Sequence, residues 1–125
     1  MPFSAGRSDQ KRVQACTSTT DGTGAGQIRR SAAVVKVTSG NANRIITLPA
    51  AKIGHEILIL ANDTGYELRA TGSGVKINNV EVVDADKELA VAAAKTVHCV
   101  CVSATEWIVT KFSNAGASAG AGTPN

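Results

Sequence analysis

The chain has 125 residues, a formal net charge of +3, and only 3% aromatic residues within a hydrophobic fraction of 43%. This length allows one domain, and so few aromatic side chains argue against a surface on which the bases of single-stranded nucleic acid stack. No stretch reaches the roughly 18 apolar residues of a membrane-spanning helix, and the N-terminus lacks the apolar run of a secretory signal, so we expect a soluble protein made in the cytoplasm.

The sequence divides into three parts by composition. Residues 34–112 carry a dense alternation of apolar and polar side chains, whereas residues 1–33 and 113–125 are rich in Gly, Ala, Ser and Thr and lack a helical or strand period. We therefore predict an extended N-terminal arm over 1–33, a β core over 34–112 and a flexible C-terminal arm over 113–125. A core of this size buries only roughly 60 to 65% of the surface of its unfolded chain, so we expect it to gain stability by forming oligomers.

Short strand patterns follow one another through the core. They cover residues 33–38, 44–48, 55–61, 66–70, 75–77, 80–82, 96–102 and 107–112, with turn-forming residues between them. Pro49 ends the second pattern because proline cannot donate to a sheet ladder. The run Ile57-Leu58-Ile59-Leu60 is apolar on both faces, which predicts a central strand. Together these patterns predict an all-β fold, a small antiparallel β-sandwich or barrel with extended N- and C-terminal arms.

Residues 84–95 leave two structures open. Asp84 can cap a helix, and the alanine run that follows favours one. We prefer a strand over residues 88–91 followed by a turn over 92–95, because so short a helix is marginal unless it packs against the core.

Basic residues set the N-terminal region apart from the rest. Residues 1–33 contain five basic and two acidic side chains, residues 34–112 contain eight of each, and residues 113–125 contain none. Such a segment can contact nucleic acid or an acidic protein surface. It can equally remain solvated and serve solubility alone, and the charge pattern leaves these alternatives open. The five basic residues are Arg7, Lys11, Arg12, Arg29 and Arg30.

No residue pattern in the chain predicts a catalyst. The run Gly22–Gly26 lacks the third glycine of a dinucleotide-binding loop, because Gln27 stands at that position. The two histidines, His55 and His98, do not lie in a loop with a nucleophile and a carboxylate. The acidic residues within 81–88 lack the spacing of a calcium loop. We therefore predict no enzymatic activity, no catalytic residue, no cofactor and no metal site.

Cys99 and Cys101 lie two apart in a strand pattern, so their thiols project from one face about 6.5 to 7 Å apart, with His98 on the opposite face. That separation and the parallel orientation disfavour a disulfide. A Cys-x-Cys pair also supplies only two of the three or four ligands that zinc needs. We predict reduced thiols that fill the core as small apolar groups, with metal or redox chemistry as the alternative.

Four segments of the core resemble a β module that recurs in virion proteins of tailed bacteriophages. They are Arg44–Gly54, Ile57–Asn62, Gly72–Asn78 and Cys99–Val109. The module is similar to parts of capsid decoration (cement) proteins, head fibres and tail-fibre segments, and the resemblance covers residues 43–112. One copy is present, and no coiled-coil or receptor-binding segment extends it, which favours a decoration protein over a fibre.

The resemblance implies a homotrimer that binds the major capsid protein on the outer surface of the shell and stabilises contacts between capsomers. The protein would be made in the host cytoplasm and located in the virion. Under this interpretation Arg7, Lys11, Arg12, Arg29 and Arg30 pair with carboxylates of the shell, and we expect no direct contact with nucleic acid or a membrane. A tail-fibre or baseplate component is the alternative, and a nucleic-acid-binding or regulatory module is a third.

Overall fold

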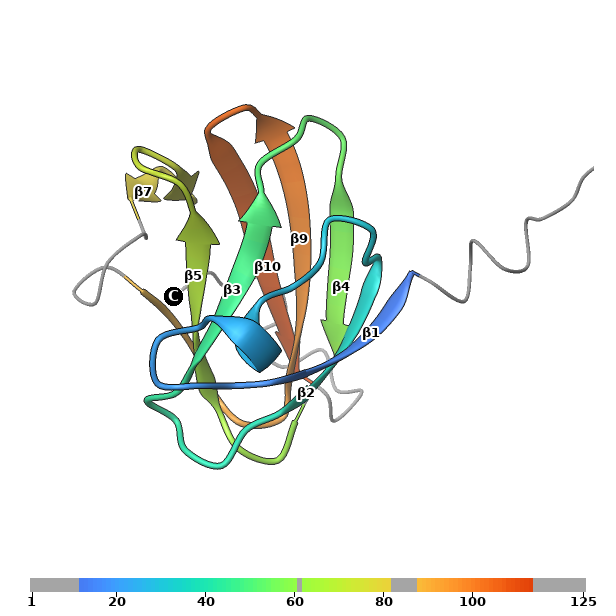
Figure 1. The fold of residues 1–125 in the computed structure, drawn as a ribbon, viewed down its shortest axis with the longest axis vertical. Helices are drawn as coiled ribbons and strands as arrows, with labels where there is room; N and C mark the ends of the chain where they lie inside the picture. Colours follow the sequence, from blue (N-terminus) through green and yellow to red (C-terminus); the bar gives the residue numbers. More distant parts are fainter. Residues whose placement is uncertain (1–11, 61, 82–87, 114–125) are drawn as a thin grey trace, which may run out of the picture.

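The computed structural model describes residues 12–60, 62–81 and 88–113. In this part of the chain, strands form two sheets that pack face to face (Figure 1), so the predicted all-β fold is confirmed. In chain order the elements are β1 Val13–Thr17, the 3-10 turn η1 Gly24–Gly26, β2 Val34–Thr38, β3 Ile45–Ala50, β4 Glu56–Leu60, β5 Tyr66–Thr71, β6 Lys76–Ile77, β7 Val80–Glu81, β8 Leu89–Val91, β9 Lys95–Ser103 and β10 Glu106–Ser113.

The larger sheet has seven strands in the order β1-β2-β4-β9-β10-β6-β7. β4 lies between β2 and β9, inside the sheet, as its apolar sequence predicts. Burial alternates along it: Ile57 and Ile59 are fully buried, while Leu58 and Leu60 are half-buried on the opposite face. The larger sheet therefore has an inner face that builds the core and an outer face that still carries apolar side chains.

The smaller sheet, in the order β3-β5-β8, covers the inner face of the larger one (Figure 1). Between the two sheets lies one hydrophobic cluster, whose largest members include Trp107, Tyr66, Ile46, Leu48 and Leu68. Full burial of a Leu or Ile side chain stabilises a fold by roughly 1.5 to 3 kcal/mol. This layer is consequently the main source of stability in the described part of the chain.

Both sheets are mixed, so the predicted antiparallel arrangement is wrong. The parallel neighbours are β1 and β2, β2 and β4, β3 and β5, and β6 and β10. The reason is that β2 and β4 belong to the larger sheet while β3 and β5 belong to the smaller one. Because the chain alternates between layers here, each strand returns to its own sheet in the same direction as before. Sequence patterns mark strands but not the sheet to which each strand belongs.

Residues 12–33 belong to the fold, so the prediction that they lie in an arm outside the core is wrong. β1 pairs with β2, and the chain then crosses to the edge of the smaller sheet, where it bridges β3 at two points. These bridges join Thr19 to Ile45 and Gln27 to Thr47. The segment thereby closes one side of the sandwich.

Apolar burial supports the same conclusion. Cys16, Ile28 and Ala32 are each 1% exposed and belong to the hydrophobic cluster between the sheets. Residues 1–11 and 114–125 lie outside the described residues, so the predicted arms remain predictions there.

Two glycines explain why a glycine-rich stretch is ordered at this place. Gly22 has a φ of +77°, and a Cβ there would lie 2.2 Å from Thr47 Oγ1. A Cβ at Gly26 would lie 2.8 Å from the backbone oxygen of Ile45. These positions are glycine because the backbone passes against β3 without room for a side chain. A composition typical of a linker thus serves close packing.

Two predicted turns have the expected form. Asn78 and Asn79 both have positive φ, which suits the tight turn predicted between β6 and β7. Within residues 84–95, the structure has a strand over Leu89–Val91 and a turn before β9, as preferred over a helix, whereas residues 84–87 lie outside the described residues.

Pro49 lies inside β3, so the prediction that it ends this strand is wrong. The register between β3 and β5 shifts between Thr47 and Ala50, which is where the proline stands. Proline is tolerated at such an irregularity because no ladder hydrogen bond is required of it. The strand therefore continues through Pro49 to Ala50.

Candidate interaction surfaces

Gln14 fixes the segment that carries Arg29 and Arg30. Its side chain is buried on the inner side of β1, where Nε2 donates to the backbone oxygen of Gln27 (3.0 Å) and Oε1 accepts from the backbone N–H of Arg29 (2.7 Å). The buried amide is thus satisfied on both sides, as burial of a polar group requires. Arg29 and Arg30 are exposed, and they project from a backbone that is held in place.

His55 joins this segment to the turn between β3 and β4. Its Nε2 lies 2.8 Å from the backbone oxygen of Ala32, so Nε2 carries a proton and donates it to this bond. The imidazole ring also packs against Trp107, with ring centroids 5.7 Å apart. The turn itself is held to β9 by the N–H of Gly54, which donates to the backbone oxygen of Cys101 (2.8 Å).

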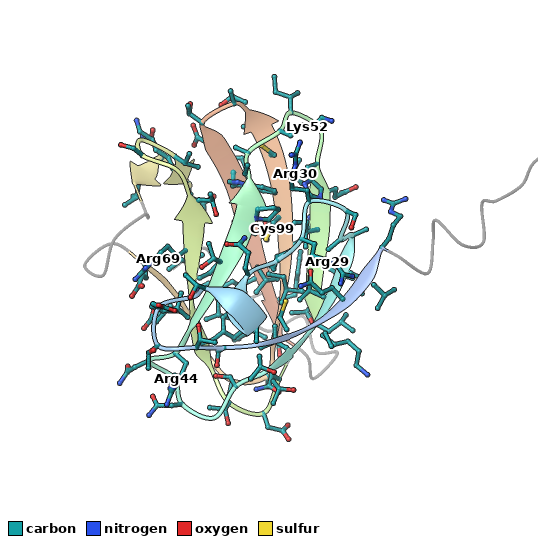
Figure 2. All side chains as sticks on the ribbon, viewed as in Figure 1. Arg29, Arg30, Arg44, Lys52, Arg69 and Cys99 are labelled. Atoms are coloured by element: carbon teal, nitrogen blue, oxygen red, sulfur yellow. The ribbon has the colours of Figure 1, made fainter. Side chains whose placement is uncertain are left out.

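Cationic side chains surround a cleft of about 400 Å³ at this junction. Figure 2 shows two of them, Arg30 and Lys52, on the same side of the molecule. Arg12 is held nearby by its backbone oxygen, which accepts from the N–H of Ala33 (2.6 Å) and Val34 (3.0 Å). The lining residues are Arg12, Arg30, Lys52, Ile53, Gly54, His55 and Glu56.

The cleft has an excess of positive charge. Within the described part of the chain, Arg12, Arg30 and Lys52 form no ion pair with a carboxylate, and the one carboxylate that lines the cleft, Glu56, lies 2.6 Å from Nε2 of His98. Arg69 makes the opposite case, because it pairs with Glu88. The three cations of the cleft are therefore available to a partner.

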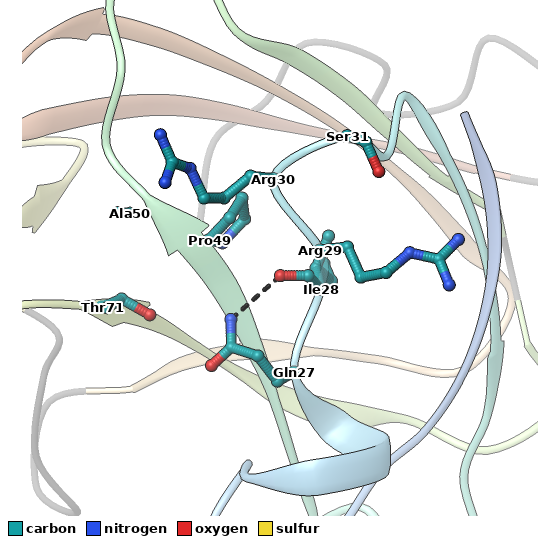
Figure 3. A pocket seen from close by; sticks show the side chains of 8 residues that line it. All are labelled: Gln27, Ile28, Arg29, Arg30, Ser31, Pro49, Ala50 and Thr71. Atoms are coloured by element: carbon teal, nitrogen blue, oxygen red, sulfur yellow. Dashed lines mark hydrogen bonds between the residues drawn. The ribbon is translucent and has the colours of Figure 1, made fainter. Parts of the chain in front are cut away.

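A groove of about 510 Å³ begins on the other side of Arg30 (Figure 3). It opens where the chain separates from β3. Ile28 still donates its N–H to the backbone oxygen of Thr47 (2.9 Å), but in a continued parallel ladder the next donor would be Pro49, which has no N–H. The side-chain amide of Gln27 donates to the backbone oxygen of Ile28 instead (3.0 Å).

The groove has an apolar floor and a charged rim. Figure 3 shows the Arg30 side chain reaching across Pro49, while Arg29 points to the opposite side of the segment. The lining residues are Gln27, Ile28, Arg29, Arg30, Ser31, Pro49, Ala50 and Thr71. Because Arg30 lines both hollows, the groove and the cleft adjoin each other.

The outer face of the larger sheet carries a second surface of a different kind. Ile108 is 42% exposed, and the register of β9 and β10 places it opposite Val100. Neighbouring strands add further apolar side chains that alternate with the buried ones. We call this set the outer apolar face: Leu58, Leu60, Val100, Val102, Ile108 and Phe112.

The predicted capsid-binding residues have different outcomes. Arg12 and Arg30 come together at the cleft, and Arg29 with Arg30 lines the groove. Arg7 and Lys11 lie outside the described residues. Lys52 was missed, because contacts between distant residues, such as that of His55 with Ala32, bring it to the same cleft as Arg30.

The cysteines are buried and free, which confirms the predicted thiols of Cys99 and Cys101 in the core. Burial raises the pKa of the Cys99 thiol above its ordinary value. Burial also raises the pKa of Cys16, although the nearby Arg29 guanidinium acts in the opposite direction. Both thiols therefore stay protonated at neutral pH.

Clusters of metal-ligating side chains and long apolar helices are both absent from the described residues. No group of three or more His, Cys, Asp and Glu side chains there is placed to hold a metal ion. None of the helical structure in those residues is long and apolar enough to span a bilayer.

Comparison with known proteins gives no relative. A scan against protein-family models, a search of curated proteins and a search of solved structures each found no match.

Proposed function

We propose that the chain is a structural protein of a tailed-bacteriophage particle, a decoration protein that binds the outer surface of the capsid as a homotrimer and stabilises contacts between capsomers. The resemblance of residues 43–112 to virion β modules supports this proposal. The β-sandwich is compatible with it.

The observation that carries the proposal is the outer apolar face. Removing apolar surface from water stabilises an interface by roughly 25 cal/mol per Å², and a face built on the strands of a sheet offers that surface without any ordering of loops. A stable interface covers about 800 Å² on each partner. Identical copies around a threefold axis would each cover part of a neighbour's face, and oligomerisation is one of the ways in which a small domain gains stability.

The cationic cleft supports the second part of the proposal, contact with the shell. Ordering a flexible arm on binding costs roughly 1 to 2 kcal/mol per residue. Arg12 and Arg30 project from a segment that is already folded, so they avoid much of this cost. Repetition in a trimer would then multiply a contact that is weak in one copy.

Two measurements test the proposal together. Light scattering should give three times the mass of the 12.8 kDa chain, and the protein should sediment with phage shells that lack a decoration protein. Ile108→Lys should yield a folded monomer, whereas Ile53→Lys, at a residue that is 70% exposed outside the outer apolar face, should remain trimeric. A wild-type monomer that leaves shells bare would contradict the proposal, and binding to tails in place of shells would favour the fibre alternative.

A further inference from the structure

We propose that the cleft and the groove around Arg30 form one binding site for an extended acidic segment of a partner protein, with an apolar side chain in the groove and carboxylates at Arg12, Arg30 and Lys52. That the partner is the shell subunit rests on the proposed function. The chemistry of the segment follows from the site itself.

Continuity of the surface is the first argument. Residues 49–50 line the groove, residues 52–56 line the cleft, and Arg30 lines both. A chain laid along residues 49–56 would therefore pass from one hollow into the other. Their volumes, about 510 and 400 Å³, each lie in the range of about 300 to 1,000 Å³ that is common for ligand sites.

Charge complementarity is the second argument. The cleft gathers Arg12, Arg30 and Lys52, and within the described residues none of them has a carboxylate partner. Guanidinium groups bind carboxylates with two parallel hydrogen bonds, which gives direction as well as strength. An acidic segment is thus the natural complement of this cleft.

The lining favours a peptide over a nucleic-acid strand. Stacking of bases needs exposed aromatic rings. Among the residues that line the two hollows, His55 alone has one. Its ring packs against Trp107 and its Nε2 is bonded to Ala32. The accessible lining of the groove is mostly apolar and instead suits an aliphatic side chain.

Spacing defines the segment further. In an extended chain, alternate side chains project from the same side roughly 6.5 to 7 Å apart. A segment with an apolar residue and two acidic residues at alternate positions presents all three side chains on one side, toward the groove and the adjoining cationic cleft.

The test is a titration of the isotope-labelled protein, followed by NMR, with an acetylated and amidated Leu-Gly-Asp-Gly-Asp peptide. Shifts should be confined to amides of residues that line the site, such as Ile53 and Gly54. Affinity should fall at least about fivefold from low salt to about 0.5 M salt, because exposed charges are screened. The double variant Arg30→Gln, Lys52→Gln should bind at least about tenfold more weakly.

Arg44→Gln is the matched control. Arg44 is exposed and lies at the other end of the molecule from Lys52 (Figure 2). Its substitution removes one positive charge, as each change in the double variant does, but should leave binding intact. Equal binding of a peptide with Asn in place of both Asp residues would overturn the inference. So would tighter binding of an oligothymidine of the same charge, or shifts elsewhere on the surface.

Shell sedimentation separates this inference from the proposed function. If the double variant binds shells as well as the wild type does, the site is wrong while the decoration function stands. If the wild type ignores shells but still binds the acidic peptide as described, the decoration function is wrong while an acidic-peptide site stands.

Discussion

The β9–β10 hairpin and residues 12–33 are held in the same sandwich by different forces. In the hairpin, neighbours in sequence pair directly across a short turn, and the inward side chains are apolar, with Trp107 the largest of them and fully buried. Residues 12–33 contact distant parts of the chain, through bridges to β3 and a bond to His55, and use a buried amide and close backbone packing.

This difference shows how a segment with few apolar side chains can be part of the fold and still keep cationic side chains exposed. Because Gln14 and the glycines fix the backbone, few apolar side chains are needed to hold the segment. Arg12, Arg29 and Arg30 stay exposed on a firm support. Substitutions on each side of this comparison should therefore differ in their cost, and the largest effect is expected in the hairpin.

Trp107→Ala should cost the most stability. It removes the largest fully buried side chain of the hairpin and leaves a cavity, so we expect a loss of about 3 to 5 kcal/mol in the free energy of unfolding. Urea unfolding followed by circular dichroism measures it. In the Ile108→Lys background, which the proposed function expects to be monomeric, Val102→Ala on the outer face should cost less than about 1 kcal/mol, while Trp107→Ala should keep its large cost. Equal losses would contradict the assignment of inner and outer faces.

Gly22→Ala tests whether the glycine-rich stretch is packed or merely a linker. The new Cβ would meet Thr47 at a strained φ, so we expect a loss of about 2 kcal/mol or more. Gly24→Ala is the matched control, since Gly24 also has positive φ but a Cβ added there would have no atom within 4 Å. It should cost about 1 kcal/mol. A linker would tolerate both changes without loss.

Alkaline pH should weaken the fold through the buried thiols. The pKa of Cys99 is raised in the folded state, so the native protein holds this proton more tightly than the unfolded chain does. Stability is therefore intact below the ordinary thiol pKa of about 8.5 and falls above it, by about 2 kcal/mol between about pH 8 and pH 10 for one such thiol. Urea unfolding at the two pH values measures the loss.

Cys99→Ala is the control for this pH dependence. In this variant the free energy of unfolding should fall less between the two pH values than it does in the wild type, whatever the absolute stability of the variant.

Cys16, in β1, should also react slowly with a thiol reagent at mildly alkaline pH, because it is buried like Cys99. Rapid reaction of Cys16 in the native protein, while Cys99 and Cys101 stay unreactive, would show that residues 12–33 are less firmly held than the hairpin.

The smallest effect is expected for Tyr66→Phe. The Tyr66 hydroxyl is buried and has no hydrogen-bond partner among the described residues, so its removal should change stability by less than about 1 kcal/mol. Ser39→Ala should cost more, about 1 to 2 kcal/mol, because the Ser39 hydroxyl links Ser18 (2.7 Å) to the backbone oxygen of Gly65 (2.8 Å). Thermal unfolding of the two variants compares them, and the reverse order would be inconsistent with the hydrogen bonds described.

Strands of the core could be predicted because their periodicity is local. Alternation in residues 96–112 marks both strands of the hairpin, and the asparagines at 78 and 79 mark a tight turn. Parallel pairing could not be predicted in this way, because it depends on which sheet receives each strand.

The candidate sites were less accessible to sequence reasoning. Gln14 is polar, so its inward position in β1 hid the strand pattern, and the glycines that pack against β3 have the composition of a linker. Arg12 and Arg30 were identified by charge alone. Lys52 joins them only through contacts between distant residues, which no local pattern records.

Hydrogen exchange of the backbone amides tests most directly whether residues 12–33 are a folded support. The prediction is that amides of Gln14 and Cys16, in β1, exchange with a protection that is within about tenfold of that of Cys99 in β9, since both strands belong to one sheet. Exchange of the β1 amides at the rate of an unfolded peptide, while Cys99 stays protected, would contradict the account.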